Sequence, residues 1–151
     1  RYDYQYMPLT MDNIHQTLQM QENWCVWRDC VSQPALDSEN KAISKVLNHW
    51  QDFHRLTSGA IMVEKDMVAY TIAERLSEDT LVIHFEKGNH DFKGIYQAIN
   101  QMFLQNAGQG FSMVNREQDL DNEGLRKAKL SYNPVGFIKK FDVNCHCRGL
   151  A

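Results

Sequence analysis

The sequence predicts an α+β protein with a mixed, mostly antiparallel central sheet flanked by helices. Two segments with helical spacing of apolar residues open the chain, and three segments with strand character follow in close succession. Helices and strands then alternate, which predicts at least one parallel strand pair bridged by a helix. The length of 151 residues fits one compact domain, so residues 1–151 are interpreted as a single domain.

The first third of the chain is expected to form two helices. Thr10 is a candidate cap for the first helix, whose opening turn includes Asn13. Pro34 is expected to end that segment, because proline disfavours helical geometry at the residue before it. The second helix is expected to begin near Asp37 or Ser38. Its apolar residues share one side at 3.6-residue spacing: Ile43, Val46, Leu47, Trp50 and Phe53.

The middle and end of the chain are expected to form the sheet. Three strands are predicted at 59–64, 67–73 and 80–86, with a tight turn at Lys65-Asp66. A helix follows, with one apolar face made of Phe92, Ile95, Tyr96, Ile99, Met102 and Phe103. The remaining expected elements are a strand at 111–115, a short helix at 124–131 and a strand at 136–143.

Composition excludes several function classes. The net charge is −3, from 16 basic and 19 acidic residues, which argues against a whole-protein electrostatic grip on nucleic acid. No apolar stretch approaches the roughly 18 residues of a membrane span. The first residues lack the apolar core of a signal peptide, so the expected location is cytoplasmic. The chain does not begin with Met, so we expect it to begin partway through a longer protein.

The four cysteines are too few for a disulfide-stapled scaffold. Cys25 and Cys30 lie five apart in a helix-like stretch, so they are expected to point to different faces and remain free, buried thiols. Cys145-His146-Cys147 offers soft metal ligands, but no Cys/His pair at zinc-finger spacing faces it. No metal site is therefore assigned.

The strand-to-helix junction between residues 80 and 99 is the strongest local candidate for a binding site. A helix beginning at 91–94 offers free N–H groups that bind anions such as phosphates. Gly94 permits close approach of a ligand, and Lys93 adds a positive charge, so both are candidate cofactor-binding residues. The alternative is that Asp91 merely caps a core helix whose Gly94 allows tight packing on the sheet.

A second candidate site follows the strand at 111–115. The end of this strand delivers Asn115, Arg116 and Glu117 to the same side of the sheet as the loop after Glu86, where ligands commonly bind. His84 lies on one face of its strand and could point into a cleft, although a hydrogen-bonded structural histidine is the commoner outcome.

The helix at 124–131 carries a cluster of positive charges in an otherwise acidic chain: Arg126, Lys127 and Lys129. Such a cluster suits a phosphate group, and the alternative is a solvated helix face. Tyr132 is either a core residue or an acid poised over a leaving group. No nucleophile elbow, glycosidase carboxylate pair, Rossmann fingerprint or Walker loop is found in the sequence.

Three stretches carry a resemblance to a known family: Phe92-Lys93-Gly94-Ile95-Tyr96-Gln97-Ala98-Ile99-Asn100, Asn115-Arg116-Glu117-Gln118-Asp119-Leu120, and the run from Glu123 through Ser131-Tyr132 to Asn133-Pro134. They resemble the C-terminal domain of the phosphatidylglycerol lysyltransferase-like family, long catalogued as a domain of unknown function. The resemblance covers about 43–143 and implies a GNAT-like acyltransferase fold. It also implies that this chain is the C-terminal half of a two-domain protein, with an N-terminal GNAT-like domain as partner and residues 1–10 as connection or first strand.

The resemblance further implies transfer of an acyl or aminoacyl group to an amine or hydroxyl acceptor. Aminoacyl-tRNA and acyl-CoA are the implied donors. The implied catalytic residues are Tyr132 as acid to the leaving group, Lys129 near the donor's phosphate or ester, and Glu117 as base for the acceptor. Backbone amides of 84–87 would polarise the donor carbonyl. The implied cofactor-binding residues are Lys93, Gly94, Asn115, Arg116 and Lys127.

The sequence departs from the acetyltransferase pattern at the pyrophosphate loop. Asp91 stands where that pattern has a cationic or amide residue, and Tyr96 replaces a small residue. An acid and a bulky ring would repel and crowd a pyrophosphate, which favours an aminoacyl donor or no donor. The alternatives are therefore a non-catalytic ligand-binding or dimerisation module, consistent with a homo-oligomer, and an RNA- or lipid-headgroup-binding domain.

Overall fold

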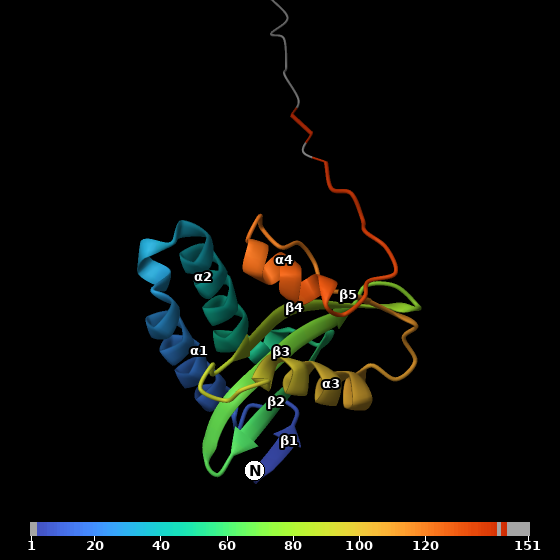
Figure 1. Ribbon diagram of the computed structural model, residues 1–151. Coiled ribbons are helices and arrows are strands. Elements are labelled where there is room, and N and C mark those ends of the chain that lie inside the picture. The colour runs from blue at the N-terminus through green and yellow to red at the C-terminus, as the bar shows by residue number, and fades with distance from the viewer. Residues whose placement is uncertain (1–2, 142, 145–151) are drawn as a thin grey trace, which may run out of the picture. The chain divides into compact units, whose positions relative to one another are not determined.

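The computed structural model describes residues 3–141 and 143–144, which fall into two compact units, Arg1–Glu117 and Gln118–Ala151 (Figure 1). The first unit contains β1 (Tyr4–Met7), α1 (Ile14–Arg28), η1 (Cys30–Ser32), α2 (Pro34–Asn48), η2 (Trp50–Asp52), β2 (Leu56–Val63), β3 (Asp66–Arg75), β4 (Thr80–Gly88), α3 (Ile95–Ala107) and β5 (Met113–Asn115). The second unit contains α4 (Glu123–Leu130).

The strands form one sheet in the order β1-β2-β3-β4-β5, as far as the chain is described. The first three pairs are antiparallel, and β4 and β5 are parallel, with α3 between them in sequence. The predicted α+β class with a mixed, mostly antiparallel sheet is confirmed. The predicted helix-bridged parallel pair is β4 with β5.

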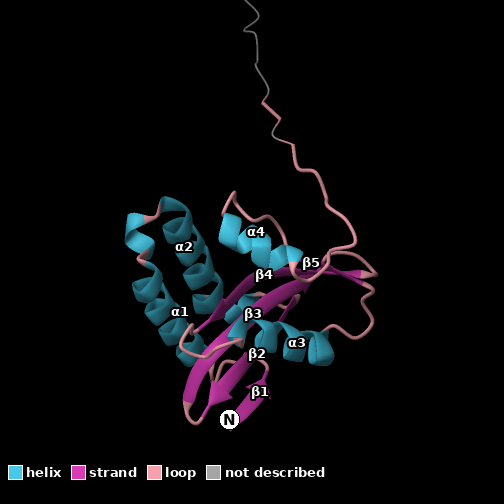
Figure 2. Cartoon of the chain, viewed as in Figure 1, coloured by secondary structure: helices cyan, strands magenta, loops and turns pink. Residues whose placement is uncertain are grey.

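Helices cover both faces of the sheet (Figure 2). Helices α1 and α2 pack on one face through a core that includes Trp24, Ile43 and Leu47. Helix α3 packs on the other through Ile99 and Phe103. Strand β3 is covered on both sides, which explains why the sequence from 67 to 73 is apolar without alternation.

The sheet divides in the middle of β4. The parallel pairing with β5 runs only from Thr80 to Val82, whereas β4 continues to Gly88. On its other side β4 carries a bulge opposite β3: Phe85 pairs with Ile72 and Ile83 with Ala73, which leaves His84 as the extra residue. The divergence of β4 and β5 begins beside this bulge.

The N-terminal helices begin and end at other residues than expected. Helix α1 ends at Arg28 because Asp29 adopts a left-handed conformation (φ 49°). Helix α2 begins at Pro34, not near Asp37 or Ser38. Proline fits the first position of a helix, where its fixed φ is suitable and no N–H is needed.

Cys25 and Cys30 form a disulfide, so the expectation of free thiols is wrong. The prediction assumed one continuous helix, in which residues five apart point to different faces. The left-handed Asp29 ends that helix before Cys30 and brings the two Cα atoms to 5.0 Å.

Helix α3 begins at Ile95 after Gly94, which has φ 82°. A Cβ built on Gly94 would meet no heavy atom within 4 Å. The expectation that Gly94 allows tight helix–sheet packing is therefore wrong. Glycine suits this position because side chains disfavour a positive φ.

In the second unit, Asn122 caps α4 by accepting a hydrogen bond from the Leu125 N–H at 2.9 Å. The strand expected at 136–143 is wrong over its described residues, which are irregular and expose Phe137, Ile138, Phe141 and Val143. Alternation alone does not make a strand, because strand backbone groups need a neighbouring strand. Cys145-His146-Cys147 lies outside the described residues. Each described helix is too short or too polar to cross a bilayer.

Candidate functional site

The backbone of Glu117, which follows the end of β5, is held by a side chain of that strand. The Asn115 Oδ1 accepts a hydrogen bond from the Glu117 N–H at 2.8 Å, and Glu117 adopts a φ of 56°. A left-handed conformation is costly for a residue other than glycine and persists where the surroundings enforce it. Asn115, predicted to bind a cofactor, therefore also fixes the backbone that carries Glu117.

The Glu117 side chain reaches the bulged histidine of β4. Its Oε1 lies 3.0 Å from His84 Nδ1, and Glu74 Oε2 lies 3.3 Å from His84 Nε2. A protonated imidazole donates to both carboxylates, and a neutral one donates to one of them. The three side chains are about one third exposed, with relative exposures of 30% for His84, 37% for Glu74 and 35% for Glu117. They form one hydrogen-bonded row, which we call the Glu74–His84–Glu117 row.

The sequence analysis singled out His84 and Glu117 but not Glu74. Glu74 lies on β3 opposite Val82, next to the bulge that turns His84 toward it. The signal that could have found it is the register of the β3–β4 hairpin, in which an acidic residue near the end of one strand faces a histidine on the next.

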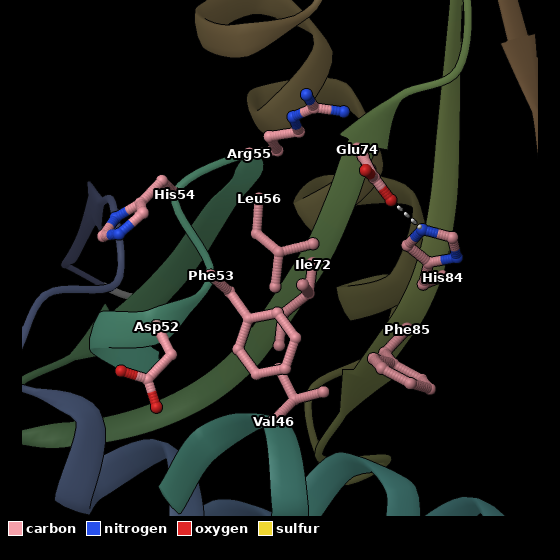
Figure 3. Close-up of a pocket in the computed structure, with 10 residues that line it drawn as sticks. All are labelled: Val46, Asp52, Phe53, His54, Arg55, Leu56, Ile72, Glu74, His84 and Phe85. Carbon is pink, nitrogen blue, oxygen red and sulfur yellow. Dashed lines mark hydrogen bonds and ion pairs between the residues drawn. The ribbon is translucent and has the colours of Figure 1, made fainter. Parts of the chain in front are cut away.

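Two members of the row, Glu74 and His84, line a cavity of about 550 Å³ (Figure 3). Its lining residues come from α2, η2 and the segment after it, β2, β3 and β4: Val46, Asp52, Phe53, His54, Arg55, Leu56, Ile72, Glu74, His84 and Phe85. The volume lies in the range of small-molecule pockets. Asp52, at the end of η2, and the two residues His54 and Arg55 were not predicted, because this short stretch has no periodic signal.

The described residues contain no group of three or more His, Cys, Asp or Glu side chains that could hold a metal ion. Within the Glu74–His84–Glu117 row, hydrogen bonds join one imidazole to two carboxylates. Carboxylates and imidazole in this arrangement can take up and redistribute a proton from a bound ligand.

Arg116 forms an ion pair across the divergence of β4 and β5. Its Nη2 donates to Glu86 Oε1 at 2.8 Å, and Glu86 Oε2 accepts a hydrogen bond from Asn100 Nδ2 at 3.2 Å. The Glu86 side chain is only 9% exposed. The positive charge predicted to serve a donor phosphate is therefore already paired with a carboxylate.

The loop between β4 and α3 contains Lys93 and Gly94, both exposed. Asn89 Oδ1 accepts a hydrogen bond from the Asp91 N–H at 2.9 Å and shapes the turn. In the first turn of α3, the Tyr96 hydroxyl accepts a hydrogen bond from Trp24 Nε1 at 3.0 Å and lies 3.3 Å from the Gly88 carbonyl, to which it donates. The bulky ring noted in the sequence is thus anchored between α1 and the end of β4.

A buried polar cluster joins α1 and α2 to β4. Lys87 Nζ donates to Glu39 Oε2 at 2.7 Å and lies 4.0 Å from the centre of the Trp24 ring. Burial lowers the pKa of the Lys87 ammonium group, while Glu39 opposes the shift. Nearby, burial raises the pKa of Tyr70, whose hydroxyl donates to Gln21. These contacts hold α1 and α2 against the sheet, and α2 contributes Val46 to the cavity lining.

Lys127, Lys129 and Tyr132 lie in the second unit. The Lys129 Nζ donates to the Gln118 carbonyl at 2.6 Å, and the Tyr132 N–H donates to the Lys129 carbonyl at 3.2 Å. Lys127 is exposed on α4. Lys129 and Tyr132 are thus joined through their backbones in the turn that ends α4.

Arg126, on the same helix, is held by acidic side chains. Its guanidinium contacts both Asp119 oxygens at 2.6 and 3.0 Å and Asp121 Oδ1 at 3.0 Å. The Arg126 hydrogen bonds lower the pKa of Asp119. The positive cluster predicted on this helix is thus partly neutralised within its own unit.

Comparisons with known proteins agree with this architecture. The family described as "Phosphatidylglycerol lysyltransferase, C-terminal" matches residues 1–144. A conserved protein of unknown function from Bacteroides thetaiotaomicron VPI-5482 has 36% identity and a TM-score of 0.84, over 89% of this chain and 46% of that one. The chain thus spans about half the length of that protein. The comparison with curated proteins found no match.

More distant solved structures share the fold. Ribosomal-protein-alanine N-acetyltransferase from Brucella melitensis biovar Abortus 2308 has a TM-score of 0.68 at 13% identity, over 95% of this chain and 100% of that one. Aminoglycoside N-acetyltransferase AAC(6')-Iy in complex with CoA has a TM-score of 0.66 at 9% identity, with 97% of each chain covered. These likenesses show a GNAT-like fold.

Proposed function

Because the chain belongs to the phosphatidylglycerol lysyltransferase C-terminal family, we propose that it transfers an activated acyl or aminoacyl group to an amine or hydroxyl acceptor. The observation that carries the proposal is the hydrogen bond of 3.0 Å between Glu117 and His84, a residue that lines the 550 Å³ cavity. It supplies a carboxylate base, oriented by an imidazole, beside a space large enough for an acceptor.

The proposed reaction has one acyl-transfer step. The acceptor nitrogen or oxygen attacks the donor carbonyl carbon, and the bond from that carbon to the leaving oxygen or sulfur breaks. Glu117 receives the proton that the acceptor loses, while Tyr132 donates a proton to the leaving group. Backbone N–H groups of β4 beyond Val82, where β5 no longer pairs, would stabilise the oxyanion.

The donor is proposed to be an aminoacyl ester of tRNA in preference to acyl-CoA. The anchored Tyr96 ring and the Asp91 carboxylate support this preference, because both disfavour a pyrophosphate at the start of α3. Lys129, Lys127 and Arg116 are the proposed contacts for the donor's phosphates, and Lys93, Gly94 and Asn115 are further proposed donor-binding residues. The CoA complex of a structural relative is the reason to test both donors.

A non-catalytic ligand-binding module is the second candidate. The observation that favours it is the Arg116–Glu86 ion pair, in which the arginine proposed to contact a phosphate is already neutralised by a carboxylate of 9% exposure. A module of this kind would retain the cavity without the transfer reaction.

Donor binding and transfer separate the two candidates. Calorimetric titration of the chain with charged tRNA and with acetyl-CoA is expected to give binding heat with charged tRNA, reduced by Lys129→Ala at low salt. A transfer assay with the bound donor and a panel of amines is expected to yield acylated amine. Binding of a donor without any transfer would favour the non-catalytic module. The absence of binding by either donor would reject the transferase proposal for this chain.

A further inference from the structure

The floor of the cavity beside the Glu74–His84–Glu117 row is apolar. Five side chains from α2, the segment after η2, and three strands form it: Val46, Phe53, Leu56, Ile72 and Phe85. Phe53 is 40% exposed, although a phenyl ring in a protein of this size is usually covered. Figure 3 shows Val46, Phe53, Leu56 and Ile72 close together, with Phe85 to one side below His84. A ligand seated here would bury apolar surface of its own against them.

The charged groups around the apolar floor differ in their direction relative to it. Glu74 and His84 face each other at one side, with Glu117 on the far nitrogen of the same ring. Figure 3 shows His54 and Arg55 extending away from the apolar side chains. Of the Glu74–His84–Glu117 row, Glu74 and His84 line the cavity, and Asp52 adds a second carboxylate to its lining, which suits a ligand with a positive charge at one end.

We propose, resting on the proposed function, that the acceptor is a primary amine carried on an apolar body. The body lies on Phe53, Leu56 and Ile72, and the ammonium group lies against Glu74. A hydroxyl group would form fewer charge-assisted hydrogen bonds there, and a polyamine would leave the apolar floor uncovered. His84 connects this contact to the proposed base, because its Nδ1 lies 3.0 Å from Glu117 Oε1.

Binding of simple probes to the full chain, without any donor, tests this inference. The probes are 2-phenylethylamine, its alcohol counterpart 2-phenylethanol, and the polar diamine putrescine. Calorimetric titration near neutral pH is expected to show 2-phenylethylamine binding at least about tenfold more tightly than either. Equal binding of the alcohol, tighter binding of the diamine, or no binding of 2-phenylethylamine would overturn the inference.

Two variants and a control locate the probe. Phe53→Ala is expected to weaken binding of 2-phenylethylamine severalfold, and Glu74→Gln is expected to reduce the preference for the amine over the alcohol. Tyr4→Ala removes an aromatic ring of 57% exposure on β1, outside the cavity lining, and is expected to bind like the wild type. Circular dichroism checks that each variant is folded. If Phe53→Ala misfolds, the binding measurements on Glu74→Gln alone test the inference. Unchanged binding in both folded variants would contradict the inference.

The two proposals fail in different ways. If 2-phenylethylamine binds but is never acylated by a donor that binds the chain, the amine-binding site stands and the transferase function is wrong. If a donor-dependent transfer occurs to hydroxyl compounds while 2-phenylethylamine does not bind, the function stands and this inference is wrong.

Discussion

Glu117 combines a left-handed backbone, a carboxylate and a histidine partner in one residue. Backbone strain of about 1–3 kcal/mol is retained at such positions where the surroundings enforce it. The Asn115 side chain provides part of that enforcement through its hydrogen bond to the Glu117 N–H. This combination is the reason to assign the proton-accepting role to Glu117 and a positioning role to His84.

Glu117→Gln is expected to lower kcat for acyl transfer by about a hundredfold or more, because an amide cannot accept the acceptor's proton. The KM for the donor is expected to stay near the wild-type value. Steady-state kinetics with varied donor measure both quantities. Glu78→Gln, at an exposed position in the turn before β4, is the matched control and should behave like the wild type. A Glu117→Gln variant with wild-type kcat would refute the assigned role.

Glu39→Ala is expected to destabilise the protein by about 2 kcal/mol, because it leaves the Lys87 ammonium group buried without its carboxylate. Lys41→Ala breaks the exposed pair with Asp37 and is expected to cost about 0.5 kcal/mol or less. Urea denaturation of both variants measures the difference. Equal losses of stability would show that the Lys87–Glu39 pair contributes no more than a surface pair.

At the scale of elements, the helices and inner strands follow from periodicity, whereas their ends follow from single residues. Asp29 ends α1 and thereby allows the Cys25–Cys30 disulfide, and no pattern in the sequence marks its left-handed conformation. The segment at 136–143 has the alternation of a strand but not the structure of one over its described residues. A strand needs a neighbouring strand to pair with, and the alternation of apolar residues does not show whether the folded protein provides one.

The start of α3 depends on the φ of Gly94. Gly94→Ala is expected to lower the free energy of unfolding by about 1 kcal/mol through backbone strain alone, since its Cβ would meet no neighbouring atom. Gly94→Asn should cost less, because asparagine tolerates a positive φ better than alanine. Thermal denaturation of the two variants provides the comparison. An alanine variant as stable as the wild type would exclude strain as the reason for glycine.

Helix α4 is expected to loosen in acid. Arg126 lowers the pKa of Asp119, so the stabilising contact is fully present above the ordinary aspartate pKa of about 4 and is lost as pH falls through the lower folded value. Carbon-13 chemical shifts of Ala128 during an acid titration report the helix. Asp119→Asn should reduce that acid-dependent change. An identical acid transition in Asp119→Asn would assign the effect to another group.

At the scale of the whole molecule, the candidate site draws on segments far apart in sequence. Glu117 and His84 were recognisable because each lies at the end or edge of a predicted strand. Their meeting with Glu74 depends on the β-bulge and on the register of β3 and β4, which residue spacing does not specify. The cavity floor likewise requires α2, β2, β3 and β4 together. The class of fold was therefore predictable, and the acceptor site emerged only from the structure.

The central claim is that the cavity beside the Glu74–His84–Glu117 row receives the acceptor. The most direct test follows the histidine ring signals by NMR while 2-phenylethylamine is added, with the His84 signal assigned from a His84→Gln variant. His15 borders a separate cavity at the β2–β3 turn and serves as the internal control. The account predicts a saturable shift of the His84 ring signals with little change at His15. A shift at His15 alone, or no shift at His84 at saturating amine, would contradict it.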